Sequence, residues 1–117
     1  MALAFTLVDT WDDGKRIHLA GTVSASGNYS TGGDTLDLSQ LPILASTQTP
    51  ITGTGWMDGL AGYDYVFAPG AALNSNKVKI FQQASGAGAF AELASGAYPA
   101  AITGDNITLY AIFKKLL

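Results

Sequence analysis

The stretch Gly21–Leu41, GTVSASGNYSTGGDTLDLSQL, decides the fold expected for this chain, and it contains no lysine, arginine, histidine or cysteine. Its apolar residues alternate with small and hydroxyl-bearing ones around glycine-rich turns, which predicts a strand, a turn and a second strand. Most general bases, nucleophiles and soft-metal sites depend on the residue types that are missing here. We therefore expect the stretch to be a shape element that forms a contact surface.

The same alternation extends to both sides of this stretch. In residues 16–25 the apolar side chains fall on an inner face (Ile17, Leu19, Val23, Ala25). The charged and polar side chains fall on an outer face (Arg16, His18, Thr22, Ser24). Downstream, Leu36 and Leu38 are expected to point inward. Alternating segments at 5–11, 63–68, 77–82 and 107–113 predict further strands, and in the first of them Phe5, Leu7 and Trp11 share one face.

Two regions give a weaker pattern. Residues 40–62 contain two prolines and many glycines and hydroxyls, so we expect a long loop with room for one short strand. A short helical turn is expected at Ala89–Ala94, where flanking glycines keep it short. Together the patterns predict a single all-β domain over 1–117: a compact antiparallel sandwich or barrel of about six to eight short strands, with glycine-rich turns and a long central loop.

The composition favours a folded protein with weakly charged surfaces. Hydrophobic residues make up 48% of the chain, charged residues only 13%, and the net charge is −3. Disorder is disfavoured because disordered chains are rich in charge and poor in apolar residues. Six scattered basic residues do not form the basic stripe that nucleic-acid binding requires. A surface with little charge loses little on desolvation, so we expect contact with a partner or with copies of the same chain.

The sequence also indicates the cellular compartment in which the protein is made and folded. It contains no cysteine, which excludes disulfides and thiolate chemistry. No basic leader and no apolar run of about 18 residues is visible, so we expect neither secretion nor membrane insertion. Two glycosylation triplets, at Asn28 and Asn106, are then coincidental. Synthesis and folding in a cytoplasm are expected.

Candidate reactive groups are few. His18 is the only histidine, and the pattern favours a polar residue on the outer face of a strand over a catalytic base. Zinc is excluded because it needs several histidine or cysteine ligands. The aspartates near turns could bind calcium, but aspartate is also an ordinary turn former, and this interpretation is preferred (Asp9, Asp12, Asp13, Asp34, Asp37). The glycine clusters lack the lysine of a P-loop. We therefore expect no catalytic residue, no cofactor and no bound metal.

Aromatic residues near glycine turns are either core residues or contact anchors, because tryptophan and tyrosine dominate binding hot spots. The pattern favours the core for Trp11 and a contact role for Trp56. The candidate interface residues are Trp11, Tyr29, Trp56, Met57 and Leu60.

Four segments carry a resemblance: KRIHLAGTVSASGNYSTGGDTLDLSQL, YDYVFAPG, NKVKIFQ and ELASGAYPAAITGDNITLYAIFKK. Their succession of strands and glycine turns resembles the small all-β structural proteins of tailed bacteriophages, in particular head-decoration (capsid cement) proteins. Residues 42–62 match least. The resemblance implies a virion protein on the capsid surface, with the major capsid protein and copies of itself, as a dimer or trimer, as partners. It implies no catalytic residue.

Three other functions stay open. A tail, fibre or head–tail joining component fits the same setting. A sugar-binding β-sandwich module is suggested by Trp56, Tyr63 and Tyr65 near glycine loops. An enzyme that depends on His18 is the least favoured.

Overall fold

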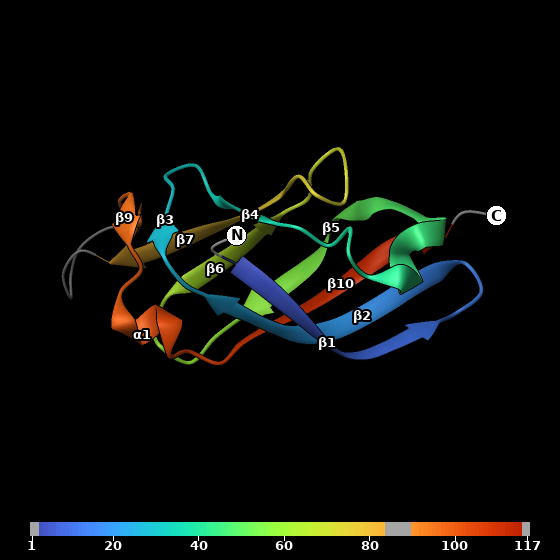
Figure 1. The fold of residues 1–117 in the computed structure, drawn as a ribbon, viewed down its shortest axis with the longest axis horizontal. Coiled ribbons are helices and arrows are strands. Elements are labelled where there is room, and N and C mark those ends of the chain that lie inside the picture. The colour runs from blue at the N-terminus through green and yellow to red at the C-terminus, as the bar shows by residue number, and fades with distance from the viewer. Residues whose placement is uncertain (1–2, 84–89, 116–117) are drawn as a thin grey trace.

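The computed structural model describes residues 3–83 and 90–115, and strands run through most of them (Figure 1). The strands are β1 (Leu3–Asp12), β2 (Arg16–Ala25), β3 (Asn28–Tyr29), β4 (Asp34–Leu36), β5 (Thr47–Asp58), β6 (Asp64–Ala68), β7 (Asn76–Gln83), β8 (Phe90–Glu92), β9 (Gly96–Ala97) and β10 (Ile107–Lys115). The helical elements are the 3₁₀ helix η1 (Pro42–Ser46) and α1 (Ala100–Thr103). The predicted all-β class is confirmed, with more strands in the described residues than the six to eight expected because several are only two or three residues long.

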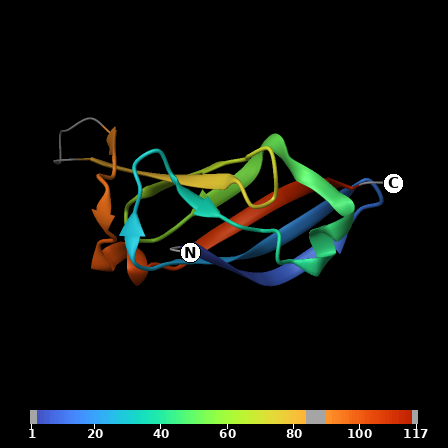
Figure 2. The same ribbon diagram turned by 45° about the horizontal axis from the view of Figure 1, so that its top comes forward.

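Two antiparallel sheets form the sandwich. The first has the strand order β1-β2-β10-β5, and the second has the order β4-β7-β6 with β8 on β7. A short ladder of β3 with β9 lies beside α1 at one end of the molecule, and the C-terminal end of β10 lies at the other (Figures 1 and 2). The shape is elongated, with extents of 48 × 25 × 24 Å. Among the described residues, the helices are too short to cross a lipid bilayer.

The core lies between the sheets and follows the predicted alternation. The four inner residues of β2 are buried, and so are Leu36 and Leu38. The stretch 21–41 does not form one hairpin, however. Its first strand belongs to the first sheet, whereas β4 pairs with β7 in the second. The segment therefore carries the chain from one sheet to the other.

A β-bulge in β1 separates the predicted from the observed position of Trp11. Leu7 pairs with Gly21 and Asp9 with Ala20, so Val8 is an additional residue in the ladder. Because side chains alternate across a strand, one additional residue reverses the faces beyond it. Trp11 consequently lies on the outer face, 44% exposed, and the expectation that it belongs to the core is wrong.

The predicted central loop is also wrong. Residues 47–58 form β5, an edge strand of the first sheet that pairs with β10. An edge strand tolerates Pro50 because one side of its backbone needs no partner. Gly55 is required by packing: a Cβ there would lie 2.2 Å from the ring of Phe67. Pro50 and Gly55, which are typical of a loop, thus fit an edge strand and a close contact between the sheets.

A helical turn is expected at 89–94, but residues 90–94 contain no helical turn. Residues 84–89 lie outside the described part, and Phe90–Glu92 form β8 on β7. In the described residues the α-helix is α1, which begins directly after Pro99, a residue suited to a helix start.

Three tyrosines of the core each donate a hydroxyl hydrogen bond to a carboxylate. Tyr29 bonds to Glu92 at 2.6 Å, Tyr65 bonds to Asp105 at 2.7 Å, and Tyr98 bonds to Asp34. Burial, together with the adjacent carboxylate, raises the pKa of Tyr29 to about 12 and raises the pKa values of Tyr65 and Tyr98 as well. Hydroxyl–carboxylate contacts thereby tie the core to β4, to β8 and to the loop before β10.

Candidate functional site: an aromatic face

The outer face of the first sheet carries a row of four rings, one from each strand: Trp11, His18, Tyr110 and Trp56. Centroid separations between neighbouring rings are 4.9 Å for Trp11 and His18, 6.0 Å for His18 and Tyr110, and 5.4 Å for Tyr110 and Trp56. The ring planes differ by no more than 24° in these pairs. We call this set the aromatic row, and the outer sheet surface around it the aromatic face.

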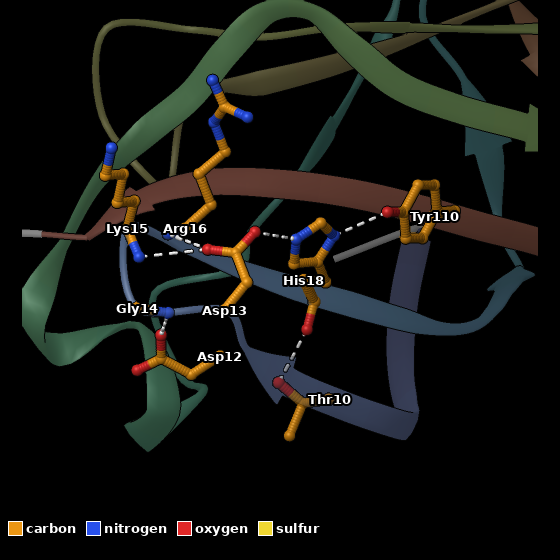
Figure 3. Close-up of polar contacts among 8 residues, drawn as sticks. All are labelled: Thr10, Asp12, Asp13, Gly14, Lys15, Arg16, His18 and Tyr110. Atoms are coloured by element: carbon orange, nitrogen blue, oxygen red, sulfur yellow. Dashed lines mark hydrogen bonds and ion pairs between the residues drawn. The ribbon is translucent and has the colours of Figure 1, made fainter.

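His18 is fixed in the row by two hydrogen bonds (Figure 3). Its Nε2 lies 2.8 Å from Oδ2 of Asp13, and its Nδ1 lies 2.6 Å from the hydroxyl oxygen of Tyr110. An ionised carboxylate only accepts, so the ring donates from Nε2–H to Asp13; in the neutral form of the ring, Nδ1 accepts from the Tyr110 hydroxyl. Asp13, His18 and Tyr110 form a chain of hydrogen bonds that sets the orientation of both rings.

Asp13 is itself held by the hairpin turn. Its Oδ1 accepts hydrogen bonds from the backbone N–H groups of Lys15, at 3.0 Å, and Arg16, at 2.8 Å. The hydrogen bond from His18, with these two backbone bonds, holds the pKa of Asp13 well below its usual range. The carboxylate is therefore ionised at neutral pH and anchors the ring chain to the turn.

Asp12 and Asp37 also accept hydrogen bonds from backbone N–H groups. Asp12 accepts from the N–H of Gly14 at 2.7 Å and pairs with Lys115 at 2.7 Å, and Asp37 accepts from the N–H and hydroxyl of Ser39. The hydrogen bond from Lys115, followed by that from Gly14, lowers the pKa of Asp12, and Ser39 lowers that of Asp37. Within 3–83 and 90–115, no group of three or more acidic or histidine residues is placed to hold a metal ion. The turn-former interpretation of these aspartates is the one that the geometry supports.

The order carboxylate–imidazole–hydroxyl is that of a serine-protease triad, with a phenol in place of the alcohol. A nucleophile must present its oxygen to a substrate, whereas the Tyr110 ring is half-buried and stacked on Trp11 and Trp56. His18 occupies the outer-face position expected for it, between buried Ile17 and Leu19. The chain of hydrogen bonds is better suited to holding rings in place than to attacking a bond.

A shallow hollow of about 570 Å³ adjoins the aromatic row on the same face. Trp56 and Tyr110 line it together with Val8 of the bulge, and the side chains of Thr22, Thr108 and Asp58 also border it. The bulge thus has two effects on this surface, because it turns Trp11 outward and leaves Val8 71% exposed.

A second exposed apolar surface lies at the end of the molecule near α1 (Figure 1). The loop 59–63 joins β5 to β6 there, and the N–H of Leu60 donates to Asp105 at 2.8 Å. Leu60 is 84% exposed and Phe90 is 64% exposed. Tyr63, Gln82, Gln83 and Phe90 line a hollow of about 310 Å³ beside the loop. We call residues 59–63, Gln82, Gln83 and Phe90 the tip; it contains no charged side chain.

The predicted interface residues divide into two groups. Trp11, Trp56 and Leu60 are exposed, so their side chains are available to a partner. Tyr29 is 1% exposed and belongs to the core, so its assignment to an interface is wrong. Met57 is half-buried and packs against the core opposite Leu109, because it lies on the inner side of β5.

Of the residues suggested for sugar binding, Tyr65 is buried and Tyr63 packs against the core. Only Trp56 of that set is exposed on the aromatic face. Sequence reasoning missed Tyr110 as a site residue, although its outward position in the alternation of 107–113 was visible. It also missed Val8, which the alternation places on the face opposite to Phe5 and Leu7, and Phe90, for which the pattern gives no signal.

Comparisons with known proteins give no further assignment: no protein-family model, no curated protein and no solved structure matches this chain.

Proposed function

We propose that this chain is a non-enzymatic virion protein that binds the outside of a bacteriophage capsid and stabilises the mature shell. One observation carries the proposal. The chain exposes two apolar surfaces, the aromatic row and the tip, on an elongated molecule, and Asp58 borders both of them. A decoration protein needs contact surfaces of this kind, since it must bind the shell and can also contact its neighbours. The likeness of the strand-and-turn pattern to head-decoration proteins supports the same function.

The physical mechanism is linkage. A protein that binds only the expanded shell stabilises that state by mass action, and the symmetry of the shell repeats each contact many times. The tip is the surface that we assign to the shell. It holds the most exposed large apolar side chain, Leu60, and its amides and backbone groups can be desolvated at lower cost than charges.

The first prediction concerns the tip. Leu60→Glu places a charge where an apolar contact is expected, and we expect binding to expanded, empty phage heads to weaken by about 30-fold or more, the effect of losing one hot-spot residue. Co-sedimentation of purified protein with heads at increasing concentration measures this.

The matched control is Val66→Glu, which makes the same chemical change at another exposed apolar residue, on β6. It should leave head binding within about threefold. If the unaltered protein stays folded but does not bind heads, the decoration function is rejected. Binding that locates to tails or to the head–tail joint by microscopy would assign the chain to a tail or joining component instead.

The hollow beside Trp56 favours carbohydrate binding as a second candidate. An exposed indole next to hydroxyl, amide and carboxylate groups (Thr22, Thr108, Asn106, Asp58) could stack on a sugar ring and bond to its hydroxyls. A glycan-array signal that is lost in Trp56→Ala and kept in Val66→Ala is the expected result for this function. A blank array for the unaltered protein removes it.

A further inference from the structure

Charges on the aromatic face are concentrated toward its two ends. Arg16 and Lys114, which pair with each other across β2 and β10, lie toward the end of the face near the C-terminus. Asp58, opposite Thr108, lies toward the other end. The central positions between them carry rings, small residues and hydroxyls (His18, Ala20, Thr22, Thr108, Tyr110, Ile112). Two further carboxylates border this face: Asp13, which accepts from His18 at the Arg16 end, and Asp9 on the edge strand β1.

We infer that the aromatic face binds the aromatic face of a second copy of this chain. The two-fold axis of the pair lies across the strands, near the level of His18 and Ala20, so the strands of the two copies run in opposite directions. The inference goes beyond capsid decoration: it names the occupant of the aromatic face, whereas the shell is assigned to the tip.

Charge complementarity selects the second copy and this orientation. With the axis across the strands, Lys114 of one copy meets the Asp58 end of the other, and the symmetry forms the contact twice. An axis along the strands would instead gather Arg16 and Lys114 of both copies at one end, where the two Asp13 carboxylates offset only part of their positive charge and the ends repel. In the described residues, neither Arg16 nor Lys114 has an intramolecular ion pair, so both are available to an outside carboxylate. The same axis brings the two Asp9 carboxylates near each other, at the level of Ala20, but on the edge strand at the rim, where solvent weakens their repulsion.

The area is sufficient for a dimer of modest affinity. Strands of nine or ten residues are about 30 Å long, and four strands span about 19 Å. The face therefore offers roughly 600 Å² per copy, near the lower limit of stable interfaces. Burial of Trp11 and Trp56 supplies the anchoring aromatic residues that such interfaces depend on. We expect a dissociation constant in the micromolar range, about 1–50 µM.

The test is a charge exchange measured by sedimentation equilibrium of the purified protein. Lys114→Glu alone and Asp58→Lys alone each place like charges together twice, and each should weaken the dimer by about tenfold. The double variant Lys114→Glu/Asp58→Lys restores opposite charges and should return to within about threefold of the unaltered protein. Lys77→Glu, which makes the same change on β7 of the other sheet, should have no effect.

A second variant tests the aromatic contact itself. Trp56→Ser should weaken the dimer by about 30-fold or more, while its circular dichroism spectrum and melting temperature stay close to those of the unaltered protein because Trp56 is exposed. A protein that is still monomeric at about 200 µM, roughly four times the weakest expected dissociation constant, overturns the inference. A dimer that ignores both the charge exchange and Trp56→Ser also overturns it, as does a monomer that binds glycans through Trp56. These measurements contain no phage heads, so their failure and a failure of head binding are separate results.

Discussion

Gly21→Ala is expected to lower the free energy of unfolding by about 3 kcal/mol, because the position has no room for a methyl group. A Cβ there would lie 2.2 Å from the backbone oxygen of Thr6 and 2.5 Å from the ring of Phe5. Gly21 lies in the middle of β2, between β1 and β10. The clash can be relieved only if β1 shifts or the ring leaves its position. Equilibrium unfolding in urea, followed by circular dichroism, measures the change.

Gly104→Ala is the matched control. The atom nearest to a new methyl group there is the backbone oxygen of Ala100 at 3.3 Å, and the φ of −95° suits any residue. We expect an effect within about 1 kcal/mol of zero. Equal losses in the two variants would contradict the account of Gly21 as a close contact between strands.

Tyr29→Phe gives the second large effect, and the effect changes with pH. The variant keeps the buried ring but removes the hydroxyl that donates to Glu92 and accepts from the N–H of Ile80 at 3.3 Å. It leaves a buried N–H without this partner, so we expect a loss of about 1–3 kcal/mol at pH 7. Urea unfolding at a series of pH values from 3 to 12 measures both the loss and its pH dependence.

The sign of the alkaline effect follows from the raised pKa of Tyr29. Its pKa is about 12 in the folded chain against 10.0 for the free side chain, so the stabilisation is complete below pH 10 and is lost as the pH rises toward 12. Tyr65 and Tyr98, whose pKa values are also raised, add to the same decline. In Tyr29→Phe the decline between pH 10 and 12 should be smaller.

At low pH the carboxylates act in the opposite sense. The hydrogen bond from Tyr29, followed by that from Gly32, lowers the pKa of Glu92 below 4.5. Burial alone would raise the pKa of Asp105, but the hydroxyl of Tyr65 and several backbone N–H groups together lower it. Stability from these groups is present above their unfolded pKa values and is lost as the pH falls through the folded ones. An alkaline decline in Tyr29→Phe as large as that of the unaltered protein would contradict the assignment to Tyr29.

The fold class could be predicted because alternation is a direct consequence of the strand geometry. Ile17, Leu19, Leu36 and Leu38 all point inward as expected. The edge strand β5 could not be recognised, since Pro50 and the glycines around it are typical of loops when a segment is considered alone. The pairing with β10 and the contact of Gly55 with Phe67 explain these residues, and both partners are distant in sequence.

The site could be predicted only in part. The glycine-rich surroundings of Trp56 predict a contact residue, and its side chain is exposed. The same argument selects Tyr29, which is buried because Glu92 and Ile80 satisfy its hydroxyl inside the fold. The aromatic row itself depends on strand register. Four residues from 11 to 110 become neighbours only when β1, β2, β10 and β5 are aligned, and a single sequence does not specify that alignment.

The bulge at Val8 makes this surface depend on strand pairing rather than on side-chain chemistry. Regular pairing of the same residues with β2 would move Trp11 to the side that holds the core. Deleting Val8, by contrast, would give regular pairing and leave Trp11 opposite His18 on the outer face. Among related chains, a bulge at this place, or the lack of one residue there, would then be a better guide to a shared binding surface than the presence of tryptophan itself.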